Sequence, residues 1–291
     1  MVISEIIKIL DTLFRKELAF EGDNCGFLIG TVHKDVKKIL IALDATDEVI
    51  DEAIKMKAGL LLVHHPLIYE PLKNITSQEK IQSKILKLIE NGIAVYAAHT
   101  NYDMMPGGLN QLFAEKMGLK DIGLLEPFHS KDNPEKEFDG AGIGRVGNLA
   151  SEKTLKDFFE ELKKRLDLES FQWLSNNRAA DIKRTIKRVA VISGGANSSA
   201  GYLSSPGFLS DAGGKAADAV IVGELKYSNA IKIAESGIIV IAVGHAESEK
   251  LAIDGMSEMI KNFLENNNNI NNDIDILKSK SGYLPWRYYF E

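Results

Sequence analysis

The sequence predicts an α/β protein of two interlinked lobes, each with a mostly parallel sheet flanked by helices. Short apolar runs of strand length alternate with segments of helical period along most of the 291-residue chain. This alternation pauses at a polar stretch near the middle and then resumes, which indicates two series of elements. Hydrophobic residues make up 45% and charged residues 26% of the chain, as in soluble globular proteins with a substantial core.

The first series starts at the N-terminus, where apolar residues recur with helical spacing and charged residues occupy the other side. Apolar runs that end at turn or polar residues are typical of strands, and a glycine directly after a periodic segment is typical of a helix end. In order, we expect a helix in residues 1–20, strands at 25–30 and 38–43, a helix at 47–57, a strand at 59–63, a helix at 78–91, a strand at 93–98 and a helix at 109–117.

Residues 127–140 have the composition of an exposed loop, so the lobe boundary is placed there. The predicted first lobe combines residues 1–127 with 245–291, and the second spans 128–244. Residues 265–273, with six asparagines, are expected to form a loop before an aromatic tail at 283–290. The second series should comprise a helix at 155–166, a strand at 188–192, a helix at 204–217, a strand at 219–222, a helix at 227–235, a strand at 238–243 and a helix at 247–264.

Charge and cysteine content narrow the classes of function. The formal net charge is −6, and no run of lysine and arginine is dense enough to follow a phosphate backbone, which argues against nucleic acid as a partner. Cys25 is the only cysteine, which excludes an internal disulfide and a thiolate zinc-finger site. No secretory signal or membrane-length apolar segment is recognised, so we expect a cytoplasmic protein without membrane association.

Four of the six histidines stand where predicted strands end. His64 and His65 follow one apolar run directly, His99 follows the next, and His245 follows the last run of the second series. Ligands of open parallel sheets collect beyond the carboxyl ends of the strands, so these positions are candidates for a site. Pro66 keeps His65 extended, and neighbouring residues of an extended chain point apart, which would let the two histidines reach different ions.

Carboxylates accompany these histidines. Asp103 stands four residues after His99, and Glu249 stands four residues after His245, where a helix is expected to begin. Imidazole with carboxylate is the ligand set of zinc, manganese, iron or nickel, and such mixed sites commonly hold two ions. The sequence therefore predicts two divalent metal ions as cofactors, held by His64, His65, Asp103, His245 and Glu249.

Each of these features also has a simpler interpretation. A His-His pair is more often a hydrogen-bonded feature than a ligand pair, Asp103 follows Thr-Asn-Tyr in a typical turn, and Glu249 resembles a solvated first-turn acid. Only their coincidence at strand ends favours ligands. His33 and His129 lie in polar stretches and are interpreted as surface residues.

Two glycine-rich segments resemble known binding motifs. Residues 142–147 fit the dinucleotide pattern, but a polar loop precedes them, so a tight turn is expected. Residues 193–196 follow a strand and form either a plain turn or a place where a substrate approaches the backbone. No phosphate loop of the Gly-Lys-Ser type is present, which argues against kinase or ATPase chemistry.

Seven segments match one known family in the same order: residues 22–30, 42–46, 62–68, 98–103, 106–110, 142–147 and 244–249. Through these segments the sequence resembles the Ngg-interacting-factor-three-like proteins, a family also known as GTP cyclohydrolase type-two homologues. The order of the matching segments along the chain is far more specific than any single motif. Departures are Tyr102, where the family usually has a smaller apolar residue, the lack of an expected histidine after Glu224, and an unfamiliar tail after Asn266.

The resemblance implies a dinuclear metal site at the same five residues, with His99 as a further ligand or as the group that transfers a proton. It also implies interlinked lobes that assemble into a ring-shaped homohexamer with the metals facing an internal cavity. The extra inserted domain of longer family members is not expected here, because the middle of the chain is too short.

Two classes of function remain open at this stage. One is a metal-dependent hydrolase that acts on a small molecule through an activated water, with His99 moving the proton. The other is a ring that carries metal or docks a partner without catalysis. Both need the same ligands, and an open coordination position would favour the enzyme. A ring that threads single-stranded nucleic acid conflicts with the acidic charge balance.

Overall fold

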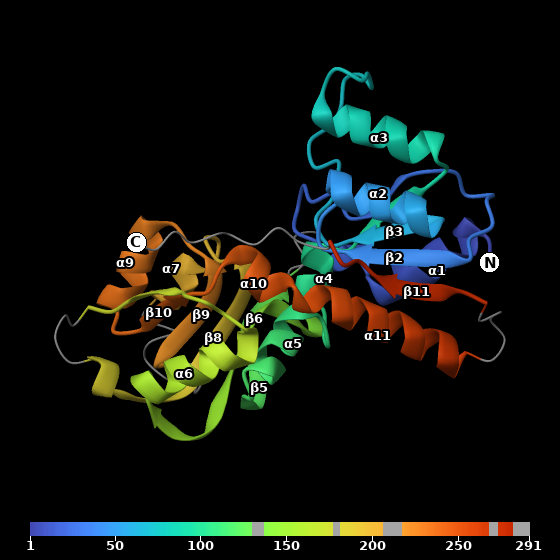
Figure 1. Ribbon diagram of the computed structural model, residues 1–291. Coiled ribbons are helices and arrows are strands. Elements are labelled where there is room, and N and C mark those ends of the chain that lie inside the picture. Colours follow the sequence, from blue (N-terminus) through green and yellow to red (C-terminus); the bar gives the residue numbers. More distant parts are fainter. Residues whose placement is uncertain (130–136, 177–180, 206–216, 268–272, 282–291) are drawn as a thin grey trace. The chain divides into compact units, whose positions relative to one another are not determined.

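A computed structural model describes residues 1–129, 137–176, 181–205, 217–267 and 273–281 (Figure 1). The chain forms two compact units. The first contains Met1–Tyr102 and the stretch that begins at Ala252, and the second contains Asp103–Leu251. Within the described residues, the second unit is therefore inserted into the sequence of the first, and the chain passes between the two units at two places.

The first unit contains a five-stranded sheet in which four neighbouring strands run parallel. Its three central strands are buried and almost wholly apolar, as expected for parallel strands covered on both faces. Only the edge strand β1 is antiparallel to its neighbour. The order is β1 (Gly26–Ile29), β4 (Ala94–Ala97), β3 (Leu60–Val63), β2 (Lys38–Ala42) and β11 (Asp275–Lys278).

Helices cover both faces of this sheet, with α2 and α3 on one face and α1 and α11 on the other (Figure 1). The start of α2 is fixed by the Thr46 hydroxyl, which accepts a hydrogen bond from the Val49 N–H at 3.3 Å. Lys57 ends the same helix in a left-handed conformation with φ 56°. The elements are α1 (Ile3–Leu13), the 3₁₀ turn η1 (Lys16–Leu18), α2 (Asp47–Met56), α3 (Lys80–Glu90), α4 (Thr100–Met104) and α11 (Leu251–Asn266), of which α4 and α11 span the unit boundaries.

The second unit contains a six-stranded mixed sheet. Its central strands β8, β9 and β10 are parallel, while the outer strands pair in antiparallel fashion. The order is β5 (Lys120–His129), β6 (Glu137–Thr154), β8 (Thr185–Gly195), β9 (Ala219–Glu224), β10 (Ile239–Ala242) and β7 (Gln172–Leu174).

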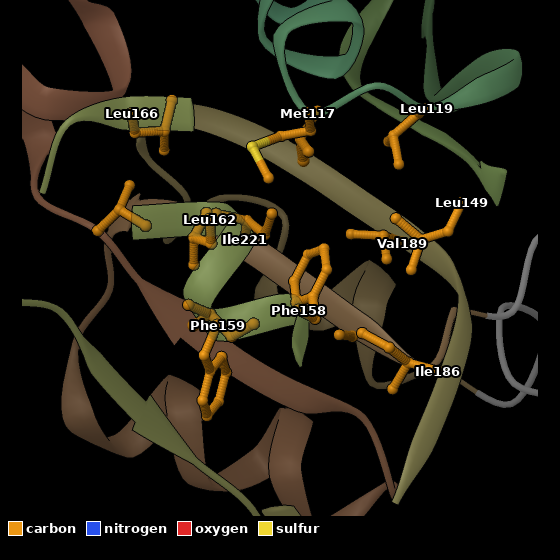
Figure 2. Close-up of a cluster of buried hydrophobic side chains, with 14 of the residues drawn as sticks. Met117, Leu119, Leu149, Phe158, Phe159, Leu162, Leu166, Ile186, Val189 and Ile221 are labelled. Atoms are coloured by element: carbon orange, nitrogen blue, oxygen red, sulfur yellow. The ribbon is translucent and has the colours of Figure 1, made fainter. Parts of the chain in front are cut away.

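Two apolar clusters fix the helices of this unit to its sheet. On one face, Phe158 and Leu162 of α6 pack with Met117 near the end of α5 and with strand residues Val189 and Ile221 (Figure 2). A second cluster joins α7 and α9 to alternate residues of the same strands. The elements are α5 (Leu109–Lys116), α6 (Leu155–Leu166), η2 (Asp181–Lys183), α7 (Ala200–Leu203), α9 (Tyr227–Glu235) and α10 (His245–Glu249).

The predicted fold class is confirmed, with two helix-flanked sheets, although the second sheet is mixed instead of mostly parallel. The loop expected at residues 127–140 is wrong where the structure describes it, because β5 extends to His129 and β6 begins at Glu137. The tight turn expected at 142–147 is also wrong, since these residues lie within β6. A Cβ at Gly142 would stand 2.3 Å from the Glu126 carbonyl oxygen, so this glycine allows close strand approach.

The division into units differs from the expected lobes at both boundaries. Residues 103–127 and 245–251 group with the second unit. The reason is that β5 pairs with β6 and α5 packs beside β8, which joins residues 103–127 to the mixed sheet. Most of the helix expected at 204–217, part of the loop at 265–273 and the aromatic tail lie outside the described residues.

Strands β7 and β11 were not anticipated from the sequence. Each is short, and β11 carries Ile276 and Leu277 between charged residues, a pattern too brief to separate from a loop. Among the described residues, no helix combines the length and apolar character that crossing a bilayer requires.

We expect Phe158→Ala to lower the free energy of unfolding of the second unit by about 3–5 kcal/mol, because it leaves a cavity under α6. Chemical denaturation followed by circular dichroism measures the change. Ile182→Ala is the control, since Ile182 is 45% exposed and should change stability by less than about 0.5 kcal/mol. Equal losses in the two variants would contradict the assignment of this core.

Candidate metal centre

Three imidazoles gather at one edge of the sheet in the first unit. His64 and His65 directly follow β3, and His99 follows β4, its parallel neighbour. Because parallel strands end at the same edge, residues far apart in sequence meet there. Ring centroids are 5.0 Å apart for His64 and His65, 5.3 Å for His64 and His99, and 5.5 Å for His65 and His99. One nitrogen from each ring lies within 4.8 Å of the others, close enough for a shared ion.

The Nδ1 atom of each of these rings is engaged by an oxygen. His64 Nδ1 lies 2.7 Å from the Ala98 carbonyl oxygen, which only accepts hydrogen bonds, so Nδ1 donates. His65 Nδ1 lies 2.8 Å from Asp44 Oδ1. A neutral ring with its proton on Nδ1 has its lone pair on Nε2. This is how metal-binding histidines are usually oriented, so the donor set fits a divalent ion.

Asp23 fixes the third ring and was not identified from the sequence. Its Oδ1 lies 2.8 Å from His99 Nδ1, while Oδ2 accepts from the Thr100 hydroxyl and, at 3.2 Å, from the Thr100 N–H. Burial alone would raise the pKa of Asp23, but the hydrogen bonds from His99 and Thr100 hold that pKa well below its ordinary value. The carboxylate therefore stays charged and keeps the His99 ring in one orientation.

Cys25 donates its thiol hydrogen to Asp23 Oδ2 at 3.0 Å. Burial, followed by the nearby Asp23 charge, raises the pKa of Cys25 to about 12. A thiol with such a pKa is almost entirely protonated near neutral pH, so it is a poor metal ligand and a poor nucleophile.

A second group of ligand-type side chains lies in the second unit. His245 begins α10, and its Nε2 lies 3.1 Å from Glu249 Oε2, one helical turn later. The Nδ1 atom of the same ring lies 3.2 Å from Glu224 Oε1, at the end of β9. Glu249 and Asp103 each place a carboxylate oxygen within 4.8 Å of the other. Two carboxylates so close repel unless a cation or a proton lies with them, so this group also fits a divalent ion.

Glycines at the ends of β8 and β9 make room for α10. Gly194 has φ +60°, and a Cβ there would stand 2.0 Å from Glu249 Oε1. A Cβ at Gly223 would stand 2.6 Å from the Ser248 hydroxyl. The segment 193–196 thus does allow a close approach to the backbone, and the group that approaches within the described structure is the protein's own Glu249.

Arg145, inside the glycine-rich segment 142–147, is buried and binds neutral oxygens. Its Nε donates to Gln111 Oε1 at 3.1 Å, and Nη1 donates to the Gly142 and Gly144 carbonyls at 2.9 and 2.8 Å. Nη2 donates to the Met105 carbonyl at 3.2 Å and to that of Gly140 at 3.3 Å. Burial lowers the pKa of Arg145 to about 10. All five N–H groups are used, so this motif clamps the backbone and does not bind a phosphate.

The structure therefore gathers the predicted residues in two groups, each within its own unit. His64, His65 and His99 form the first group, and Asp103, His245 and Glu249 form the second. The partners that orient the rings were missed, namely Asp23, Asp44 and Glu224. Asp44 directly follows a predicted strand, as His64 does, so its position at the same sheet edge was the available signal.

The sequence model of the family Duf34/NIF3 (NGG1p interacting factor 3) matches residues 1–281. The chain belongs to this family. The predicted resemblance is thereby confirmed over nearly the full length. A Clostridium perfringens relative named GTP cyclohydrolase 1 type 2 homolog is 32% identical over 288 residues, covering 99% of this chain and 100% of the relative.

Two solved structures are similar to this chain in fold. A Bacillus cereus protein related to NIF3 superposes with a TM-score of 0.81 at 25% identity and covers 99% of both chains. Reduced HcgD from Methanocaldococcus jannaschii gives a TM-score of 0.72 at 31% identity, covering 96% of this chain and 97% of its own. These likenesses support the fold of the described residues.

We expect Gly194→Ala to displace Glu249 and to destabilise the metal-free second unit by at least about 1–2 kcal/mol, because the residue is left-handed and the added Cβ collides with the carboxylate. Gly195→Ala is the matched control, since its Cβ would meet nothing within 4 Å. Chemical denaturation of both variants measures the difference. Equal stability would show that the close approach of α10 to Gly194 is not needed.

Proposed function

We propose that this chain binds two divalent metal ions through His64, His65, Asp103, His245 and Glu249 and uses them to hydrolyse a small molecule. The observation that carries this proposal is the pair of ligand groups, one in each unit, built from imidazoles and carboxylates. In the first group every ring has its Nδ1 engaged by an oxygen atom. Metal-binding histidines typically have such a hydrogen-bond partner on the ring nitrogen that does not face the ion, whereas solvated histidines do not need one.

Candidate ligands of both groups lie close in sequence to the points where the chain passes from one unit to the other. The chain passes from the first unit to the second between Tyr102 and Asp103, three residues after His99. It returns between Leu251 and Ala252, two residues after Glu249. Among the described residues, both crossings therefore lie next to candidate ligands in the sequence.

The chemistry of the donors limits the ions. Imidazole nitrogen and carboxylate oxygen suit zinc, manganese, iron or nickel, whereas magnesium and calcium prefer sites built from oxygen alone. Five ligands exceed the four that a tetrahedral zinc ion takes, and mixed sites of this size commonly hold two ions. The proposal is therefore a dinuclear centre.

When bound, divalent ions would act as Lewis acids that make water a better nucleophile near neutral pH. His99 is the proposed proton-transfer group of this chain, acting through Nε2 while Asp23 holds Nδ1. The Asp23 carboxylate is charged and its side chain is buried, so it holds the His99 ring in one orientation. The name of the Clostridium perfringens relative, GTP cyclohydrolase 1 type 2 homolog, supports a nucleotide as the first substrate to test.

Two further features complete the proposal, and the family resemblance implies the first of them. The protein would assemble as a ring-shaped homohexamer with its metal centres facing an internal cavity, and it would work in the cytoplasm. Size-exclusion chromatography with light scattering tests the assembly directly.

The metal site is tested by elemental analysis of purified protein. We expect two equivalents of metal per chain in the wild type and at most one in His65→Ala, because that imidazole is a proposed ligand. His33→Ala is the control, since His33 is exposed and outside both groups, and it should keep two equivalents. If His65→Ala retained the full metal content, the proposed ligand set would be wrong.

Catalysis is tested by a screen of nucleotides, phosphoesters and amides with metal-loaded protein. We expect hydrolysis that a chelator abolishes and that zinc or manganese restores. His99→Ala should lower the rate by roughly 100-fold or more, the usual contribution of a general acid or base. If the loaded protein hydrolysed none of these substrates, the enzyme proposal would be abandoned in favour of a metal-carrying ring.

A further inference from the structure

A chain of hydrogen bonds connects the backbone of Asp103 to the segment that carries His245. The Asn110 side-chain amide donates to the Asp103 carbonyl at 3.0 Å. The other end of that amide, Oδ1, accepts the Ser193 N–H at 2.8 Å and the Ser193 hydroxyl at 3.3 Å. Asn110 therefore ties the residue that supplies one carboxylate to the end of strand β8.

The next residue of β8 continues the connection. The Gly194 N–H donates to the Ser248 hydroxyl at 2.9 Å, and that hydroxyl donates to the His245 carbonyl at 2.8 Å. Ser248 lies between His245 and Glu249 in α10. Ser193 thus hydrogen-bonds to Asn110 of α5, and Gly194 hydrogen-bonds to Ser248 of α10.

Burial makes these bonds effective restraints. Asn110 is 2% exposed, Ser193 6% and Ser248 0%, so water does not compete for their polar groups. Gly223 is also required here, because a Cβ on it would stand 2.6 Å from the Ser248 hydroxyl. Neither Asn110 nor Ser248 offers a charged group or an imidazole, so neither is itself a candidate ligand.

The candidate ligands restrained by these hydrogen bonds include two carboxylates that lie close together. Carboxylate oxygens of Asp103 and Glu249 lie within 4.8 Å, and their repulsion would separate them in the absence of an ion. Metal affinity depends on donor positions to within a few tenths of an ångström. A scaffold that keeps these residues at a set spacing therefore prepares the site before an ion arrives.

We propose that Asn110 and Ser248 are positioning residues that set the spacing between Asp103 and the His245–Glu249 pair, and thereby the affinity and geometry of the ion bound there. This inference rests on the proposed metal site. It gives a role to Asn110, in segment 106–110, and to Ser248, between His245 and Glu249. Neither residue is a candidate ligand, so metal coordination alone gives no reason for its presence.

The test compares Ser248→Ala with Ser236→Ala, using Co²⁺ as the probe ion in the full-length protein. Ser236 is the matched control, because its hydroxyl also donates to a carbonyl three residues earlier, that of Ile233 at 2.6 Å, away from the ligands. We expect Ser248→Ala to weaken Co²⁺ binding by about 10–100-fold, as loss of an outer partner typically does. The visible absorption of bound Co²⁺ should also change, which a purely structural role would not cause.

Asn110→Asp provides a second variant that keeps the acceptor for Ser193 and removes the donor to the Asp103 carbonyl. We expect it to change the Co²⁺ spectrum as well. Because both residues belong to one connection, the loss of affinity in the double variant should be smaller than the product of the two single losses. This variant also keeps the test decisive if Ser248→Ala fails to fold.

The outcomes separate this inference from the proposed function. If His245→Ala loses a bound ion while Ser248→Ala and Asn110→Asp match the Ser236→Ala control in affinity and spectrum, the positioning role is overturned and the metal site stands. If wild-type protein binds no Co²⁺, both are overturned. Reduced affinity with an altered spectrum in the two variants, and not in the control, supports the inference.

Discussion

Holding an imidazole in one orientation is the constraint on which the rest of this molecule depends. A histidine side chain rotates about two bonds, and only an engaged Nδ1 defines where Nε2 points. Here the Ala98 carbonyl, Asp44 and Asp23 provide that restraint for three rings at one sheet edge. The parallel strands bring these partners together, and the buried apolar residues of β2, β3 and β4 keep the strands in register.

Much of this organisation could be predicted from the sequence, because strand ends are marked by an abrupt change from apolar to polar residues. Such a change places His64, His65 and His99 at one edge once the strands are recognised as parallel. Helix ends were predicted closely where a cap or a periodic face defined them, as for α6 and α9. These signals lie within a few neighbouring residues, so they can be recognised without knowledge of the tertiary structure.

Features that depend on distant residues were not predictable in this way. Asp23 lies 76 residues before His99, and nothing around it indicates that it would orient an imidazole. The pairing of β5 with β6 was missed because glycines and charged residues interrupt the apolar pattern of these strands, and Gly142 is needed for their close approach. The role of Arg145 could not be predicted either, because most of its acceptors are backbone carbonyl groups, which every residue carries and no sequence motif marks.

The insertion of one unit into the other has a consequence for how the protein is made. Asp103–Leu251 is continuous, so a ribosome delivers every strand of the mixed sheet before the other sheet is complete. The first unit must wait with Lys38–Ala42 as an exposed apolar edge until Asp275–Lys278 emerges and pairs with it. Until then the unpaired edge of β2 could pair with another chain, and a chaperone that shields this strand would act on a half that was synthesised first yet finishes last.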